Sequence, residues 1–153
     1  MNNRIVSIEQ LHELVGKDLE PSPWVQLSQQ RISDFADVTE DYQFIHVDPE
    51  KAKATPFGGT IAHALLTLSM LPSLLEKTLP AVEGMKTSIN YGFNKVRFLA
   101  PLRSGKRIRA KFGITGFSET APGRYQMLTN VTVEIEGEDK PALIAEWIFM
   151  ILV

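Results

Sequence analysis

The segment from Thr60 to Leu75 contains no Lys, Arg, Asp or Glu, and it follows the glycine pair Gly58-Gly59. Its apolar residues occupy all sides of a helix, so we expect a helix that is capped by Thr60 and buried on every side. Pro72 predicts a kink or a break near its end. A helix of this kind needs other elements wrapped around it, which limits what the rest of the chain can form.

The second half of the chain provides such a wrapping, because its apolar residues alternate with a period of two. The alternation is clearest from Tyr125 to Ile135, and it also predicts strands over residues 86–98 and 108–114. A slip in the pattern at Asn94-Lys95 predicts a bulge. The nearly continuous apolar run from Leu143 to Val153 is typical of a strand covered on both faces. We therefore predict an α+β fold with about four long antiparallel strands in one curved sheet around the helix.

Shorter elements are expected in the first half of the chain. Ser7-Ile8-Glu9-Gln10 has the pattern of a capping box, Ser28 can cap a second helix, and Asp48-Pro49 begins a third. A short extended stretch at Trp24 is a candidate edge strand. We expect a single domain over residues 1–153, in which residues 1–23 form an N-terminal helical extension.

Composition excludes several classes of function. The 153 residues include 16 basic and 18 acidic side chains and no cysteine, with a formal net charge of −2. Disulfides, a thiolate nucleophile and a Cys-ligated zinc site are therefore ruled out, and the charge gives no general attraction to nucleic acid or to a membrane. No apolar run reaches the roughly 20 residues that span a bilayer, and the start does not resemble a signal peptide, so we expect a cytoplasmic protein.

Two places in the chain carry groups suited to chemistry. Asp41 and His46 lie on one short loop, where a carboxylate and an imidazole can perform acid/base chemistry near neutral pH. The spacing alone favours a structural role, in which Asp41 simply caps the helix end or a turn. The Gly58-Gly59 loop leads into helix amides that can bind an anion, or it is an ordinary turn before a core helix. By itself, His63 is expected to be packed within the structure. Three histidines and no metal motif predict no metal site.

A cluster of basic residues falls within one predicted strand pair, and a solvated strand face explains most of it. A few of these side chains could meet ligand phosphates, but no aromatic residues are interleaved with them, so we expect no nucleic-acid partner. The cluster consists of Lys95, Arg97, Arg103, Lys106, Arg107, Arg109 and Lys111.

Three blocks together carry a family resemblance: Asp41 to Pro49, Pro56 to Thr60, and Ile61-Ala62-His63-Ala64. They resemble the MaoC-like dehydratases, which include the R-specific enoyl-CoA hydratases, and the stretch from Tyr91 to Phe98 is similar to the nodulation protein N branch. The resemblance implies a hot-dog fold, in which an antiparallel sheet wraps a helix. It also implies a homodimer or higher homo-oligomer, with the active site near the subunit interface.

The resemblance assigns roles by position. Asp41 and His46 match the pair that activates water for addition to C3 of a trans-2-enoyl-CoA thioester, giving the (R)-3-hydroxyacyl-CoA without a cofactor. Ala64 matches a position usually held by glycine, whose amide lies in the oxyanion hole, and Gly59 and His63 flank it as substrate-binding residues. Gln43-Phe44 replaces the Asn-Pro of many relatives. An acyl-CoA thioesterase and a non-catalytic acyl-thioester binding module are the alternatives.

Overall fold

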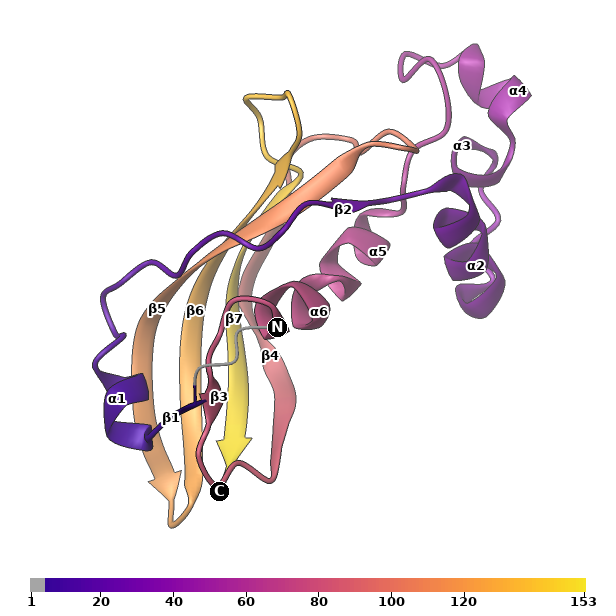
Figure 1. Cartoon of the computed structure of the whole chain (residues 1–153). Helices are drawn as coiled ribbons and strands as arrows, with labels where there is room; N and C mark the ends of the chain where they lie inside the picture. The colour runs from indigo at the N-terminus through magenta and orange to yellow at the C-terminus, as the bar shows by residue number, and fades with distance from the viewer. Residues whose placement is uncertain (1–4) are drawn as a thin grey trace.

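The computed structural model describes residues 5–153, and its main feature is a curved five-stranded antiparallel sheet. The sheet curls around two short helices, α5 (Ala64–Ser69) and α6 (Leu71–Glu76), as Figure 1 shows. This is the predicted α+β hot-dog arrangement. From one edge to the other, the strands are β2 (Val25–Gln26), β5 (Arg107–Ala121), β6 (Arg124–Ile135), β7 (Leu143–Leu152) and β4 (Thr87–Phe98).

The alternating pattern places one face of β5 and β6 in the core and the other in solvent, as predicted. Ile108, Ala110, Phe112 and Ile114 are buried on the inner face of β5. On the outer face, the basic residues of β5 pair with glutamates in β6 and just after it. Carboxylate oxygens of Glu134 lie 2.6 Å from Arg109 Nε and 2.5 Å from Lys111 Nζ, and Glu136 pairs with Arg107. Much of the basic cluster is therefore a solvated ion-pair ladder.

Strand β4 forms one edge of the sheet and pairs on its other side with β7. Its register shifts between Phe93 and Lys95, at the predicted bulge, and also between Asn90 and Gly92. Almost every residue of β4 has an exposed or half-exposed side chain, although the strand carries aromatic residues. The edge of the sheet beside β4 is thus both apolar and open.

The uncharged segment differs from its prediction at its start. The helix begins at Ala64 rather than at Thr60, because the residues before it are extended and bonded to neighbouring segments: Ile61 N donates to Ile45 O, and Ala62 N donates to Leu102 O. The Thr60 hydroxyl caps no helix and donates instead to Gln29 Oε1 at 2.5 Å. The prediction of burial on every side is also wrong, since Leu65 is 59% exposed. The predicted break occurs at Met70, just before Pro72.

The N-terminal part runs along the open edge of β5. Strand β1 (Ile5–Val6) pairs in parallel with β3 (Ala81–Val82), and α1 (Ile8–His12) begins with the predicted Ser7 capping box. Residues 16–22 then bond to β5 through the amides of Gly16, Leu19 and Ser22. Within residues 5–153, no helix combines the length and the apolar character needed to cross a bilayer.

Three helices form a lobe that extends beyond the sheet (Figure 1). They are α2 (Gln29–Thr39), α3 (Phe44–Val47) and α4 (Pro49–Lys53). As predicted, Ser28 caps α2 by accepting from Arg31 N, and Asp48 caps α4 by accepting from Lys51 N. We refer to residues 28–54 as the α2–α4 lobe.

Candidate active site

Asp41, His46 and His63 come together where the α2–α4 lobe meets the start of α5. Helix α2 ends at Thr39 and is followed by Glu40, whose backbone is left-handed (φ 59°) and turns the chain into Asp41. His46 lies on α3, and His63 immediately precedes α5. One side-chain nitrogen or oxygen atom from each of these three residues lies within 4.8 Å of the other two. The structure thus brings together the predicted acid/base pair and a second histidine.

The orientation of the His46 ring follows from one hydrogen bond. Its Nδ1 lies 2.7 Å from the carbonyl oxygen of Ile61, and because a carbonyl only accepts, Nδ1 carries the proton and Nε2 keeps a free lone pair. His46 is 7% exposed. Burial is the largest influence on its pKa and lowers it, assisted by His63 and opposed by the Ile61 bond and by Asp41. His46 is therefore suited to accept a proton near neutral pH.

His63 lies deeper than His46 and contacts both members of the pair. Its Nε2 lies 3.0 Å from the backbone oxygen of Asp41 and 4.0 Å from Asp41 Oδ2. Its ring stacks on that of His46, with centroids 3.8 Å apart and planes at 25°, and Phe35 packs nearby at 5.1 Å. His63 Nδ1 is buried and has no hydrogen-bond partner within residues 5–153.

The donor set of this cluster does not suit a metal ion, although it contains two imidazoles and a carboxylate. A nitrogen ligand binds a metal along its lone pair, which lies in the ring plane, at about 2.0–2.1 Å for zinc. Two rings that stack at 3.8 Å in nearly parallel planes cannot both direct a lone pair at one ion.

A cavity of about 340 Å³ joins His46 to Ala64. Ala64 is the first residue of α5, where a backbone amide has no partner within the helix. The Asp41 side chain is 53% exposed at the surface beside this cavity. The other residues that line the cavity are Ile61, Ala62, Thr67, Phe98, Leu99, Ala100, Pro101, Leu102 and Ala142.

Gly59 lies apart from this cavity. An added Cβ at Gly59 would lie 3.0 Å from a guanidinium nitrogen of Arg103, and Arg103 donates to the carbonyl of Gly58 at 2.8 Å. Among the described residues, Gly59 is therefore next to Arg103 and not among those that line the space beside His46. The glycine pair instead shapes the loop that precedes the extended residues 60–62.

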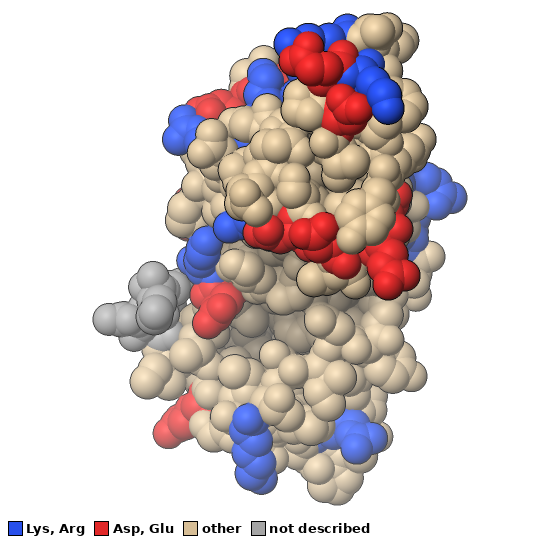
Figure 2. Space-filling model, turned by 90° about the vertical axis from the view of Figure 1, so that its right-hand side faces the viewer, with Lys and Arg blue, Asp and Glu red and all other residues tan. Residues whose placement is uncertain are grey.

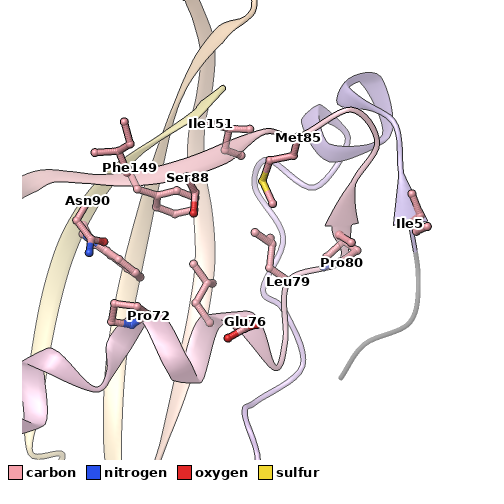
Figure 3. Close-up of a pocket in the computed structure, with 14 residues that line it drawn as sticks. Ile5, Pro72, Glu76, Leu79, Pro80, Met85, Ser88, Asn90, Phe149 and Ile151 are labelled. Atoms are coloured by element: carbon pink, nitrogen blue, oxygen red, sulfur yellow. The ribbon is translucent and has the colours of Figure 1, made fainter. Parts of the chain in front are cut away.

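A larger cavity of about 700 Å³ lies between α6, the segment after it, and strands β4 and β7, and sequence reasoning missed it. Figure 3 shows Leu79, Met85 and Phe149 around this space. Figure 2 shows that the same side of the molecule is hollowed beneath a band of acidic side chains. Its walls are mainly apolar, and Pro72 and Leu75 of the uncharged segment contribute to them. The lack of charged residues from Thr60 to Leu75 was therefore the one sequence feature that could have indicated this cavity, because some residues of the segment line the cavity and others pack in the core.

Comparison with known proteins gives matches over most of the chain. The model of the MaoC like domain matches residues 10–137. The 3-hydroxyacyl-thioester dehydratase Z of Mycobacterium tuberculosis is 46% identical over 140 residues, which cover 92% of each chain. Nodulation protein N of Rhizobium meliloti is 44% identical over 144 residues, which cover 94% of this chain and 89% of that one.

The fold is also found among solved structures. The (R)-hydratase from A. caviae involved in PHA biosynthesis superposes with a TM-score of 0.72 at 25% identity. The match covers 88% of this chain and 94% of the hydratase chain. The curved sheet and the helices within it are therefore shared with an (R)-hydratase.

Proposed function

Because the chain belongs to the MaoC-like dehydratase family, we propose that it catalyses the reversible hydration of a trans-2-enoyl-CoA thioester to the (R)-3-hydroxyacyl-CoA. The protein is a hydro-lyase of the 3-hydroxyacyl-thioester dehydratase type. The observation that carries the more specific proposal is the placement of His46. A side-chain nitrogen of His46 lies within 4.8 Å of a carboxylate oxygen of Asp41, and the same residue lines a cavity with Ala64.

In this proposal, Asp41 and His46 hold the reacting water between them. The water loses a proton to the pair as its oxygen bonds to C3 of the enoyl group, and a proton is delivered to C2. The C2–C3 double bond is thereby consumed and one water is added in total. The reverse reaction removes the C2 proton and the C3 hydroxyl. Two acid/base groups suffice for both directions, and no redox step is involved.

The amide of Ala64 is proposed to stabilise the thioester oxygen. Addition to C3 moves negative charge onto that oxygen, and a preorganised N–H donor is worth most where such charge develops. Ala64 carries a methyl group where glycine would leave the approach to the amide open. Substrate access beside Ala64 is therefore narrower in this chain than glycine would make it.

The larger cavity is proposed to accept the acyl chain. Pro72 follows Ala64 by eight residues, which corresponds to at most about 12 Å at about 1.5 Å per helical residue, because the chain changes from α5 to α6 at Met70. An acyl chain that is bound by its thioester near Ala64 must be of medium length to reach the space between Leu75 and Phe149. Burial of its methylene groups against the apolar walls then stabilises the bound substrate.

A second copy of the chain is the proposed partner along β4. Strand β4 presents unpaired backbone groups along its outer edge, and its Tyr91 is 68% exposed, with Ile89, Phe93 and Phe98 also exposed. A long apolar edge of this kind is an aggregation hazard unless another chain covers it. Phe98 also lines the cavity next to His46, so a homodimer formed along β4 would complete the walls of the site.

The proposed function is tested by loss of the conjugated enoyl-thioester absorbance with crotonyl-CoA and octenoyl-CoA. Wild type should consume at least the longer substrate, whereas Asp41→Asn and His46→Ala should each lose about 10²–10⁴ in rate. Asp34→Asn, an exposed acid on α2, is the matched control and should keep full activity. Retained activity in folded Asp41→Asn or His46→Ala would refute the assigned roles.

Two other results would contradict hydration itself. Release of free CoA thiol from a saturated acyl-CoA, without loss of the enoyl band, would favour a thioesterase. Binding of acyl-CoA without any chemistry would favour a non-catalytic module.

A further inference from the structure

We propose that His63 is a positioning residue, which fixes both Asp41 and His46 without contacting the substrate. The inference rests on the proposed function of this pair. It departs from the role that the sequence suggests for His63, namely contact with substrate. Three observations support it: the hydrogen bond of His63 to Asp41, the stack of its ring on His46, and the burial of its side chain.

The first observation is the bond to Asp41. Since the backbone oxygen of Asp41 only accepts, His63 Nε2 must donate to it across 3.0 Å. Asp41 follows the left-handed Glu40, where a residue with a Cβ is under backbone strain, and its carboxylate accepts a long bond of 3.4 Å from Gln43 N. The His63 bond therefore ties this strained turn to the start of α5.

The second observation is the stack on His46. His46 is held at its edge by the Ile61 carbonyl and at its backbone by Gln29, which donates to His46 O at 2.7 Å. Neither bond prevents the ring from tilting out of plane. The His63 ring covers one face at 3.8 Å, so it fixes the direction in which Nε2 points.

The third observation is the burial of His63 itself. The side chain is 3% exposed, and among the described residues it lines neither of the two cavities. Its Nδ1 is enclosed, with Phe35 and His46 packed against the ring. A group in this position acts on the reaction only through the residues that it touches.

Two substitutions separate the two contacts. His63→Phe keeps an aromatic ring against His46 but removes the donor to Asp41, and His63→Gln keeps an Nε2 donor but removes the stack. Each should lower kcat by about 100-fold, as expected when a reacting group is displaced by about 1 Å, and leave KM nearly unchanged. His12→Phe is the matched control, because His12 packs edge-on against Phe117 away from the site, and it should keep wild-type kinetics.

The pH profile gives a readout that a purely structural role would not move. The titratable groups facing His46 are Asp41 and His63, and the Ile61 carbonyl is its other polar neighbour. His63 lowers the pKa of His46, so its removal should raise that pKa. The acid limb of kcat/KM should consequently move to higher pH in His63→Phe, and in His12→Phe it should not move.

Wild-type protein provides a test that does not depend on whether the variants fold. Nitrogen-15 chemical shifts of the imidazoles should show the Nε2–H tautomer for His63 and the Nδ1–H tautomer for His46. The opposite tautomer at His63 would overturn the inference. So would a rise in KM at constant kcat, which indicates substrate contact, or unchanged kinetics in folded variants. An inactive wild type would instead refute the proposed function, so the two failures are distinguishable.

Discussion

His46 and Ile61 are joined by a hydrogen bond of 2.7 Å from the imidazole Nδ1 to the backbone carbonyl oxygen. A second bond of 3.0 Å, from Ile61 N to Ile45 O, links the same two segments. Helix α3 has only four residues and would hold a side chain poorly by itself. The buried, extended segment before α5 therefore orients the imidazole more firmly than its own helix does.

The first prediction concerns the pH dependence of the wild type. Burial lowers the pKa of His46 below its usual value of 6.5, and a base must be unprotonated to act. Activity should therefore persist as the pH falls through 6.5 and decline only at a lower pH. A profile of kcat/KM against pH measures this directly, and an acid limb above 6.5 would contradict the assigned base.

The second prediction concerns Ala64. Substitution of Ala64 by Gly removes the methyl group next to the proposed oxyanion donor, and Ala64→Val enlarges it. We expect kcat/KM to rise by about tenfold in Ala64→Gly and to fall by at least as much in Ala64→Val. Leu65→Val, at the exposed neighbouring position, controls for general effects on α5. Equal values of kcat/KM in both Ala64 variants would show that the Ala64 amide does not contribute to the reaction.

The third prediction concerns the length of the acyl chain. Ala81 is exposed and lines the larger cavity, so Ala81→Phe should fill that space without overpacking the core. The KM for octenoyl-CoA should rise by about tenfold or more, while that for crotonyl-CoA stays constant. Ala121→Phe, at an exposed hairpin position, is the control. An equal rise in KM for both substrates would show that the acyl chain does not bind in the larger cavity.

The fourth prediction concerns the β4 edge. An aspartate in place of Tyr91 puts a charge on the exposed apolar strand, where burial against a second chain is costly. Sedimentation should show a dimer for wild type and a larger monomer fraction for Tyr91→Asp. Thr115→Asp, exposed on β5, should sediment as wild type. A wild-type monomer at micromolar concentration would refute the proposed pairing.

Much of the fold could be predicted because the strands carry a strong local pattern. The alternation in β6, the bulge near Lys95 and the caps at Ser28 and Asp48 are all confirmed. Thr60 misled because a hydroxyl before an apolar run usually indicates a cap, whereas here it bonds to Gln29, 31 residues earlier in the chain. Long-range hydrogen bonds of this kind leave no periodic trace in a sequence.

The candidate site was less predictable than the fold. Asp41 and His46 stand five positions apart, and that spacing alone left a structural role for Asp41 open. His63 lies 22 residues after Asp41 in the sequence, and only folding brings it to this pair. The stack of the His63 ring on His46 therefore has no counterpart in the sequence pattern. The larger cavity was missed for the same reason, because its walls come from helix, loop and two strands. The roles of Asp41, His46, Ala64 and Gly59 stay predictions.

The α2–α4 lobe is expected to unfold before the sheet does. It carries Asp41 and His46, and Ile32 is its one fully buried side chain in the main core cluster, whereas its buried Ala36 and Ala52 stand outside that cluster. Segments with little buried apolar surface open locally at a lower free energy than the whole domain unfolds. Hydrogen exchange should therefore be faster in this lobe than in β6, and mild heating should inactivate the enzyme while its sheet is still folded.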